Sequence, residues 1–124
     1  MNLNKIYTLG DSPFSQRIGD WCRHHNIQFH AYERDERVNS EVDGLVIFHE
    51  DHNLDAMEMD LRKEFEKKLK PIHKIDVNGT KQVSVSHFVL WLERNHCQDI
   101  LMVGNEKLIN NANFEALLLK MVSK

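Results

Sequence analysis

The sequence predicts an α/β fold in which one sheet of five mainly parallel strands is covered by helices on both faces. Two observations carry this prediction. Short apolar segments of four to six residues alternate along the chain with longer amphipathic segments, which is the pattern of repeated βα units. The segment "LVIF" at residues 45–48 is also continuously apolar, as expected for a strand with helices on both sides.

The first half of the chain is expected to form a strand at residues 5–9, followed by a helix. Ser12 is placed to cap this helix, and Pro13 fits its first position, where a missing N–H costs nothing. A second strand is expected at residues 27–32, because apolar and polar residues alternate there. The link at residues 33–43 has little apolar periodicity, so the sequence leaves open whether it is helical.

A long amphipathic helix is expected after the strand at residues 45–48. Its predicted core face carries apolar residues at steps of three and four, namely Leu54, Met57, Leu61, Phe65 and Leu69. Its opposite face is predicted to expose Glu58 and Glu64, paired with Arg62 and Lys68. Pro71 then ends the helix.

The second half of the chain continues the same alternation. It contains a fourth strand at residues 72–77, a helix around 85–92, a fifth strand at 99–104 and a last helix from about Asn113. We therefore expect a single α/β domain over residues 1–124, with a three-layer doubly wound (flavodoxin-like) sheet of order 2-1-3-4-5.

Composition excludes several classes of partner. The 124 residues include 16 basic and 19 acidic side chains, which are mixed along the chain and give a net charge of -3. This balance provides no basic stripe for nucleic acid and no polybasic membrane anchor. No apolar run approaches the length of a membrane span, and the start lacks a signal peptide, so we expect a cytoplasmic protein. Cys22 and Cys97 are expected to be reduced.

The expected ligand site lies beyond the carboxyl ends of strands one, three and five, where such sheets bind ligands. The residues placed there are Gly10, Asp11, Ser12, Ser15, Glu50, Asp51 and Asn105. The first turn of the helix at Pro13 offers N–H groups to a phosphate or carboxylate, although Asp11 opposes an anion there. The simpler alternative is that Asp11 and Ser12 only cap the helix.

The segment "HEDH" at residues 49–52 has the residue types of a metal site, since His49 and His52 flank two carboxylates. The segment falls on a predicted loop, and no second ligand cluster has metal spacing. We therefore expect no metal and no cofactor.

The opening "KIYTLGDSPFSQRIGDWCRHHNIQFHAYERD" resembles a glutaredoxin locally. Ser12 and Ser15 stand where that family has its redox cysteines, and Pro71 in "PIHKIDVNGTKQVS" stands at the place of its conserved proline. Thiol–disulfide exchange requires a thiolate, so this resemblance implies no redox activity.

Residues 5–77 resemble the TIR-like and nucleoside deoxyribosyltransferase-like group of domains more broadly. The resemblance rests on "KIYTLGDSPFS", the aspartate-led strand "VDGLVIFHED" and the strand after a Lys-Pro pair in "LKPIHKID". It implies a nucleotide- or nucleoside-binding domain that acts on an N-glycosidic bond, with Glu58 as the catalytic carboxylate. The transferases' Gly-Thr before that glutamate is absent, and their glutamate lies closer to the Lys-Pro pair, which makes Glu64 the substitute. The alternative is a noncatalytic signalling module that binds a protein partner or a second copy of itself.

Overall fold

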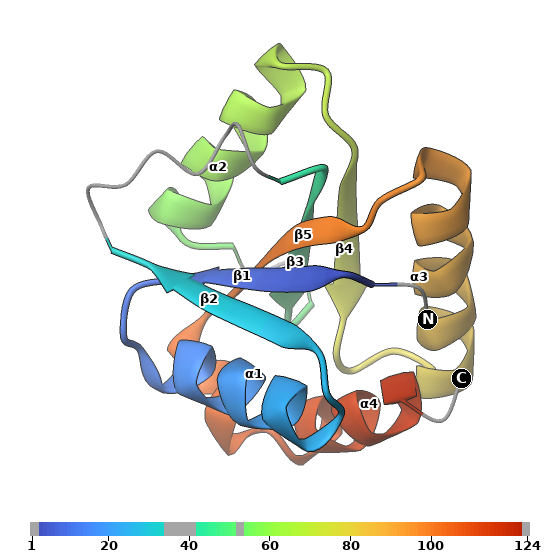
Figure 1. The fold of residues 1–124 in the computed structure, drawn as a ribbon. Helices are drawn as coiled ribbons and strands as arrows, with labels where there is room; N and C mark the ends of the chain where they lie inside the picture. The colour runs from blue at the N-terminus through green and yellow to red at the C-terminus, as the bar shows by residue number, and fades with distance from the viewer. Residues whose placement is uncertain (1–2, 34–41, 52–53, 123–124) are drawn as a thin grey trace.

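The computed structural model describes residues 3–33, 42–51 and 54–122. Figure 1 shows one sheet with its flanking helices, and all the strand pairs are parallel. The strands are β1 (Lys5–Leu9), β2 (Gln28–Tyr32), β3 (Gly44–His49), β4 (Ile72–Asp76) and β5 (Asp99–Gly104). The helices are α1 (Pro13–His24), α2 (Ala56–Lys67), α3 (Lys81–Asn95) and α4 (Ala112–Val122), with a 3₁₀ helix η1 (Glu106–Asn110) before α4. Most of the link predicted at residues 33–43 lies outside the described residues.

The strand order is β2-β1-β5-β3-β4, so the predicted order 2-1-3-4-5 is wrong in the position of β5. This strand lies between β1 and β3 and pairs with both. Its apolar segment Ile100–Val103 is fully buried, whereas β4 includes the exposed Lys74 and lies at an edge. The most apolar strands therefore take the central positions, where both faces are covered.

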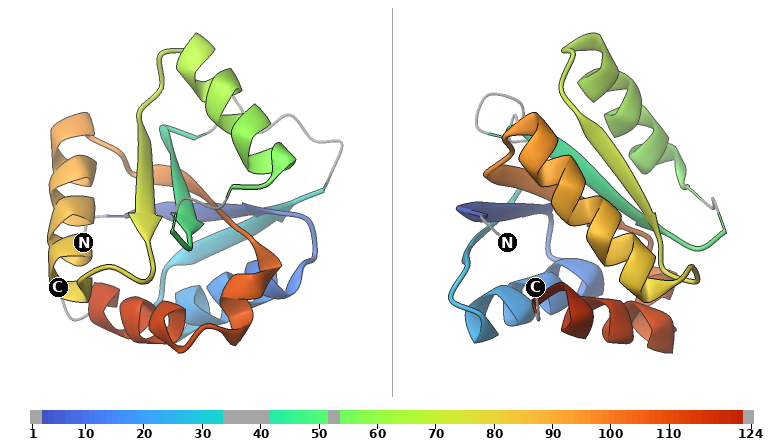
Figure 2. Two further views of the ribbon diagram at one scale, coloured as in Figure 1. Left: turned by 180° about the vertical axis from the view of Figure 1, so that it is seen from behind. Right: turned by 90° about the vertical axis from the view of Figure 1, so that its right-hand side faces the viewer.

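The helices divide unevenly between the two faces of the sheet. α1, α3 and α4 pack against one face and α2 packs against the other, as Figures 1 and 2 show. Right-handed crossovers that travel in opposite directions along a sheet place their helices on opposite faces. α1 and α3 lead toward the β2 edge, whereas α2 leads toward the β4 edge. Among the described helices, only α2 lies on the second face, and it packs mainly on β3 and β4.

The core consists of two apolar clusters, one on each face. The larger cluster lies beneath α1, α3 and α4 and includes Trp21, Phe48, Phe88 and Phe114. The smaller cluster lies on the α2 side and includes Tyr7, Tyr32, Leu45, Ile47, Phe65, Leu101 and Val103. Every residue of β3 is buried, so the prediction that residues 45–48 and 99–104 form interior parallel strands is confirmed.

The predicted core face of α2 is correct for Phe65, which is fully buried, and for Leu54 and Leu61, which pack partly buried against the same cluster, but it is wrong at Met57, Glu58 and Leu69. Glu58 and Phe65 are its buried residues. Met57, expected in the core, is 47% exposed, and Glu58, expected in solvent, is 0% exposed. Glu58 and Phe65 lie seven positions apart and so share one helix face, which turns Met57 out of the core at the start of α2. Leu69 lies beyond the helix end, where it is 92% exposed. Met57 belongs to the wall of a cleft, as shown below.

Three helices are followed by a residue in the left-handed region that is not glycine. Asn26, Leu69 and His96 have φ values of 56°, 57° and 53°. After α2, the N–H of Lys70 donates to the carbonyl of Phe65 at 3.0 Å. This bond closes a Schellman motif, in which glycine is the favoured residue at the left-handed position. Leu69 therefore holds a strained conformation without burying its side chain.

Two glycines shape the carboxyl edge of the sheet. Gly10 has φ 70°, and its N–H donates to the carbonyl of Tyr32 at 2.7 Å, which ties the loop after β1 to the end of β2. At the end of β5, a Cβ on Gly104 would lie 2.5 Å from the ring of Phe14 and 2.7 Å from Leu108. The close approach of α1 and η1 to β5 therefore requires a glycine there.

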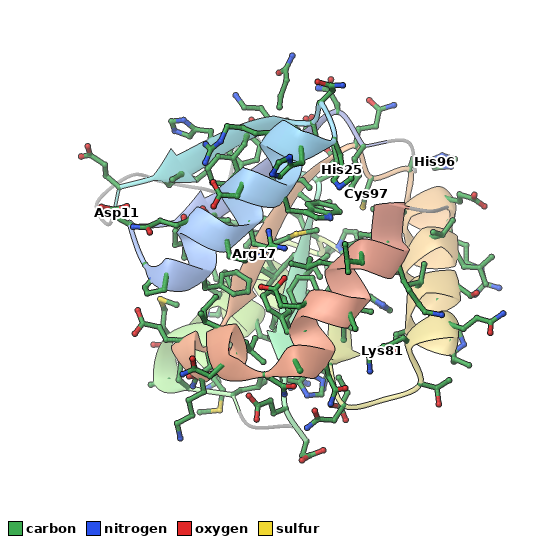
Figure 3. All side chains as sticks on the ribbon, turned by 90° about the horizontal axis from the view of Figure 1, so that it is seen from below. Asp11, Arg17, His25, Lys81, His96 and Cys97 are labelled. Atoms are coloured by element: carbon green, nitrogen blue, oxygen red, sulfur yellow. The ribbon has the colours of Figure 1, made fainter. Side chains whose placement is uncertain are left out.

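A side-chain pair connects α1 to α4. Figure 3 shows Arg17 between the two helices, and its Nε lies 2.8 Å from Oε1 of Glu115. A second guanidinium nitrogen lies 2.6 Å from Oε2, so the pair is bidentate. Trp21 adds a hydrogen bond from its indole N–H to the carbonyl of Leu118 at 3.0 Å. These contacts fix α1, whose first turn borders the candidate site.

Candidate functional site

An open cleft lies at the carboxyl ends of β1, β2 and β5, next to α2. Its volume is about 1600 Å³. Parallel strands end at the same edge of a sheet, and doubly wound proteins bind their ligands at that edge. The residues that line the cleft are Leu9, Gly10, Asp11, Ser12, Pro13, Ala31, Tyr32, Glu33, Asp55, Met57, Asp60, Leu61, Glu64, Gly104, Asn105 and Glu106.

Carboxylates dominate the charge of this cleft. Of its lining residues, six are acidic and none is Lys, Arg or His, as far as the described residues extend. The acidic ones are Asp11, Glu33, Asp55, Asp60, Glu64 and Glu106. Leu9, Tyr32, Met57 and Leu61 add apolar surface between them. The described part of the lining therefore carries more acidic than basic side chains, and one of these acids, Glu64, is paired with Lys68 outside the lining.

The loop after β1 is organised around helix capping. Ser12 Oγ accepts a hydrogen bond from the N–H of Ser15 at 3.1 Å, and Pro13 contributes no N–H. Ser15 is buried, and its hydroxyl pairs with that of Thr8 in the interior. The first turn of α1 therefore has fewer backbone N–H groups left to donate to a ligand. With Asp11 beside it, the loop is poorly suited to hold a phosphate.

Glu58, the predicted catalytic residue, is buried beneath α2 and does not line the cleft. Neither of its carboxyl oxygens has a hydrogen bond of good geometry to another described residue. Burial, with a smaller contribution from the neighbouring Asp55 carboxyl, raises the pKa of Glu58 to about 8, and the backbone N–H of Asp55 partly opposes this rise. At neutral pH the Glu58 carboxyl is therefore mainly protonated.

Asp55 connects Glu58 to the cleft. Its side chain caps α2 by accepting a hydrogen bond from the N–H of Glu58 at 2.8 Å, and the same residue lines the cleft. Glu64, two turns further along α2, lines the cleft as well. Its carboxylate lies 3.8 Å from Lys68 in the predicted pair, whereas Arg62 pairs with Glu66 at 3.1 Å and not with Glu58.

The residues predicted after β3 lie apart from the cleft, because neither Glu50 nor Asp51 lines it. The N–H of Asp51 donates to Asp76 at 3.3 Å, and the Asn78 amide donates to Asp51 at 3.5 Å. Asn78 in turn accepts a hydrogen bond from the amide of Asn111 at 3.1 Å. These contacts form a separate polar network at the ends of β3 and β4.

Sequence reasoning named strand-end residues of the cleft, such as Asn105, and it named Glu64 on the α2 wall. It did not single out Asp55 and Asp60 on that wall, and it placed Met57 in the core. A signal for Asp55 is present in the sequence. Its spacing to Glu58, D-x-x-E, is that of a capping box and marks the start of the helix.

The described residues contain no group of three or more His, Cys, Asp or Glu side chains arranged to hold a metal ion. His49 is buried at the end of β3, and His52 lies outside the described residues. None of the described helices has the length and apolar character needed to span a membrane.

Neither of the two cysteines lines the cleft. Both are free and buried, and burial raises the pKa of the thiol to about 12 in Cys22 and about 11 in Cys97. A thiol with such a pKa forms little thiolate at neutral pH. Figure 3 shows Cys97 and Asp11, which borders the cleft, at opposite ends of the molecule.

A solved structure with the same fold is that of a "putative molybdenum carrier protein" from Syntrophus aciditrophicus. The match has a TM-score of 0.74, covers 97% of this chain and 94% of that chain, and has 15% sequence identity. At this identity the similarity shows a Rossmann-like α/β fold, without distinguishing the TIR-like or deoxyribosyltransferase groups. No protein-family model matches the sequence, and no curated protein sequence matches it.

Proposed function

We propose that this protein binds a small organic ligand in the cleft at the carboxyl edge of its sheet. The cleft itself carries the proposal, because it lies where doubly wound sheets hold ligands. It also combines carboxylates with apolar surface from Leu9, Tyr32 and Met57. Apolar walls supply contact area and a few polar groups supply orientation in typical ligand pockets. A ligand-holding role also agrees with the similarity of the fold to that of a "putative molybdenum carrier protein".

The charge of the cleft narrows the class of ligand. A nucleotide would bring its phosphates next to Asp11, Asp55 and Glu64, without a basic side chain among the described lining residues to compensate. A nucleoside has no phosphate, so it is not repelled by these carboxylates. The same reasoning disfavours a molybdenum oxyanion in this cleft. We therefore favour a neutral or positively charged molecule, with nucleosides as the first class to test.

A second candidate function is cleavage or transfer at an N-glycosidic bond, which the TIR-like and deoxyribosyltransferase-like resemblance implies. Glu64 favours this function because it lines the cleft, where a carboxylate can oppose positive charge on a sugar ring. Glu58 is less suited, since it is buried and mainly protonated at neutral pH. In a catalytic domain we expect Glu64 to take the role first assigned to Glu58. The noncatalytic signalling module is the alternative in which no ligand is turned over.

Thermal unfolding with matched ligands tests the binding proposal. Adenosine should raise the melting temperature, whereas AMP and molybdate should leave it unchanged, because a ligand stabilises only the state that it binds. Glu64→Gln should reduce the difference between the melting-temperature shift caused by adenosine and that caused by AMP. Glu66→Gln is the control, because Glu66 lies on the same helix in a similar ion pair but outside the cleft. The proposal is wrong if no neutral or cationic molecule stabilises the protein, or if AMP stabilises it as strongly as adenosine.

Release of free adenine from adenosine tests the catalytic alternative. Turnover that falls by orders of magnitude in Glu64→Gln, with adenosine-induced stabilisation retained, supports the glycosidic function. Turnover that persists in Glu64→Gln and is lost in Glu58→Gln would reverse the assignment of the two residues. Absence of turnover together with stabilisation by adenosine supports a binding domain.

A further inference from the structure

The turn between β4 and α3 contains the only Asn-Gly pair in the sequence, Asn78-Gly79. The turn is tight, because the N–H of Gly79 donates to the carbonyl of Asp76 at 3.1 Å. The N–H of Asn78 donates to the Asp76 carboxylate at 3.0 Å. An asparagine before glycine is chemically labile, because glycine has no side chain to keep its backbone nitrogen away from the asparagine amide. Asn78 is exposed, so water reaches it.

The side chain of Asn78 is held by two other asparagines, and we call Asn78, Asn111 and Asn113 the asparagine clamp. The side-chain oxygen of Asn78 accepts hydrogen bonds from the side-chain amides of Asn111 at 3.1 Å and Asn113 at 3.0 Å. The amide nitrogen of Asn78 lies 3.5 Å from a carboxylate oxygen of Asp51. The clamp connects the turn after β4 to the start of α4. None of its three residues lines the cleft.

We propose that Asn78 is a site of spontaneous deamidation, and that the asparagine clamp keeps this reaction slow in the folded protein. In the reaction the backbone nitrogen of Gly79 loses its proton to solvent and attacks Cγ of Asn78. The new N–Cγ bond closes a succinimide ring, the Cγ–Nδ2 bond breaks, and the nitrogen leaves as ammonia after taking a proton from water. A water molecule then opens the ring at Cγ to give aspartate, or at the backbone carbonyl carbon to give isoaspartate. No atom is oxidised or reduced.

Two sets of contacts oppose the attack in the folded protein. The N–H of Gly79 is engaged with the carbonyl of Asp76. The clamp hydrogen bonds fix the amide of Asn78, so the side chain must leave them before it can rotate toward Gly79. The rate therefore follows the fraction of molecules in which the clamp is open. Loss of one hydrogen bond of ordinary strength raises that fraction about fivefold.

Deamidation changes the contacts between the two turns. It places a new carboxylate next to Asp51 and Asp76, and like charges at short distance repel one another. Isoaspartate also lengthens the backbone just before α3. Lys81, at the start of α3 in Figure 3, donates to the side chain of Asn113 at 2.9 Å, so the same region connects α3 to α4. The deamidated protein should therefore lose stability where these two helices pack together.

Two conservative variants open the clamp and keep its other contacts. Asn111→Asp and Asn113→Asp each remove one amide donor to Asn78. A carboxylate at position 111 still accepts from the N–H of Asn113, which lies 2.8 Å from the present side-chain oxygen. A carboxylate at position 113 still accepts from Lys81.

Three controls separate the clamp from other causes. Asn110→Asp adds the same charge next to the clamp and leaves both donors in place. Leu101→Ala lowers overall stability by removing a buried side chain, and it leaves the clamp intact. Gly79→Ala, combined with Asn113→Asp, hinders the attack itself. A Cβ at Gly79 would lie 3.3 Å from the carbonyl oxygen of Asp76, which a small shift accommodates.

Peptide mass spectrometry after incubation at pH 8 measures loss of the Asn78 amide, and an isoaspartyl methyltransferase assay measures isoaspartate. Wild type, Asn110→Asp and Leu101→Ala should react at least about tenfold more slowly than a synthetic peptide of residues 75–82, because both clamp hydrogen bonds are intact. Asn111→Asp and Asn113→Asp should each react about fivefold faster than wild type and give isoaspartate as well as aspartate. Adding Gly79→Ala to Asn113→Asp should slow the reaction again.

The contrary results are equally specific. Clamp variants that react at the wild-type rate would overturn the proposal, as would a wild type that reacts as fast as the peptide. If Leu101→Ala reacts as fast as the clamp variants, global unfolding controls the reaction and the role of the clamp is wrong. Aspartate formed without isoaspartate would exclude the succinimide route and overturn the assignment of Gly79 as the attacking group.

Discussion

Glu58→Gln is the most informative single change, because it removes a buried ionisable group while keeping its size. The pKa of Glu58 is raised from 4.5 to about 8 by burial and the Asp55 carboxyl, so the folded state holds the proton more tightly than the unfolded chain does. A rise of this size corresponds to at most about 5 kcal/mol. Relaxation around an ionised carboxylate reduces the cost, so we expect about 2 to 4 kcal/mol.

The sign of the effect depends on pH. Below pH 4.5 the carboxyl is protonated in both states, and wild type and Glu58→Gln should have similar stability. As pH rises from 4.5 to about 8, the unfolded chain releases the proton first, and the wild type loses stability relative to the variant. At pH 9 the free energy of unfolding of the variant should therefore exceed that of the wild type by about 2 to 4 kcal/mol.

Urea denaturation at pH 5, 7 and 9, followed by circular dichroism, measures this difference. Subtracting the wild-type free energy of unfolding from that of the variant cancels the other titrating groups. Glu64→Gln, which changes an exposed acid on the same helix, is the matched control. A Glu58→Gln difference that is constant from pH 5 to pH 9 would refute the reasoning.

The remaining predictions concern stability. Phe48→Ala and Leu101→Ala, at fully buried positions, should each cost about 2 to 5 kcal/mol in chemical denaturation, and a loss under about 1 kcal/mol would contradict the core assignment. Leu69→Gly should stabilise by about 1 kcal/mol because it relieves a left-handed backbone at no loss of burial, whereas Leu69→Ala should not. Burial lowers the pKa of His73 to about 4, so the protein should lose stability as pH falls from 6.5 toward 4, and His73→Phe should remove this loss. An unchanged acid profile in that variant would contradict the lowered pKa of the half-buried His73.

The secondary structure could be predicted from the sequence because its signals are local. Ser12 with Pro13 marks the start of α1, and the apolar run at residues 45–48 marks β3. Strand order is different, because it depends on which strands compete best for the centre of the sheet. Both β4 and β5 fit a parallel sheet, and only their relative apolar content indicates that β5 takes the central position between β1 and β3 while β4 takes the edge.

Part of the candidate site could be predicted, because that part depends on where strands end and not on the order of the strands. Gly10, Asp11, Ser12 and Asn105 lie at strand ends, and parallel strands bring their ends together at one edge in any order. The position of β5 separates the end of β1 from that of β3, so Asp51 falls into a different network. Apart from Glu64, the residues of the α2 wall were not assigned to the site, because they do not follow a strand. Finding them requires the rotation of α2 about its axis, which apolar spacing alone assigned incorrectly.

The uneven division of the helices between the two faces of the sheet accounts for the position of the cleft and for the packing of α2. α1, α3 and α4 share one face of the sheet, and α2 is the described helix on the other, so surface beside β1 and β2 is left for a cleft. α2 has no neighbouring described helix on its face, and it buries Phe65 and Glu58 fully and Leu61 partly against the sheet. One of these two anchors is an acid whose charge is unfavourable in the core. Ionisation of Glu58 at high pH should therefore destabilise the packing of the helix that forms the cleft wall.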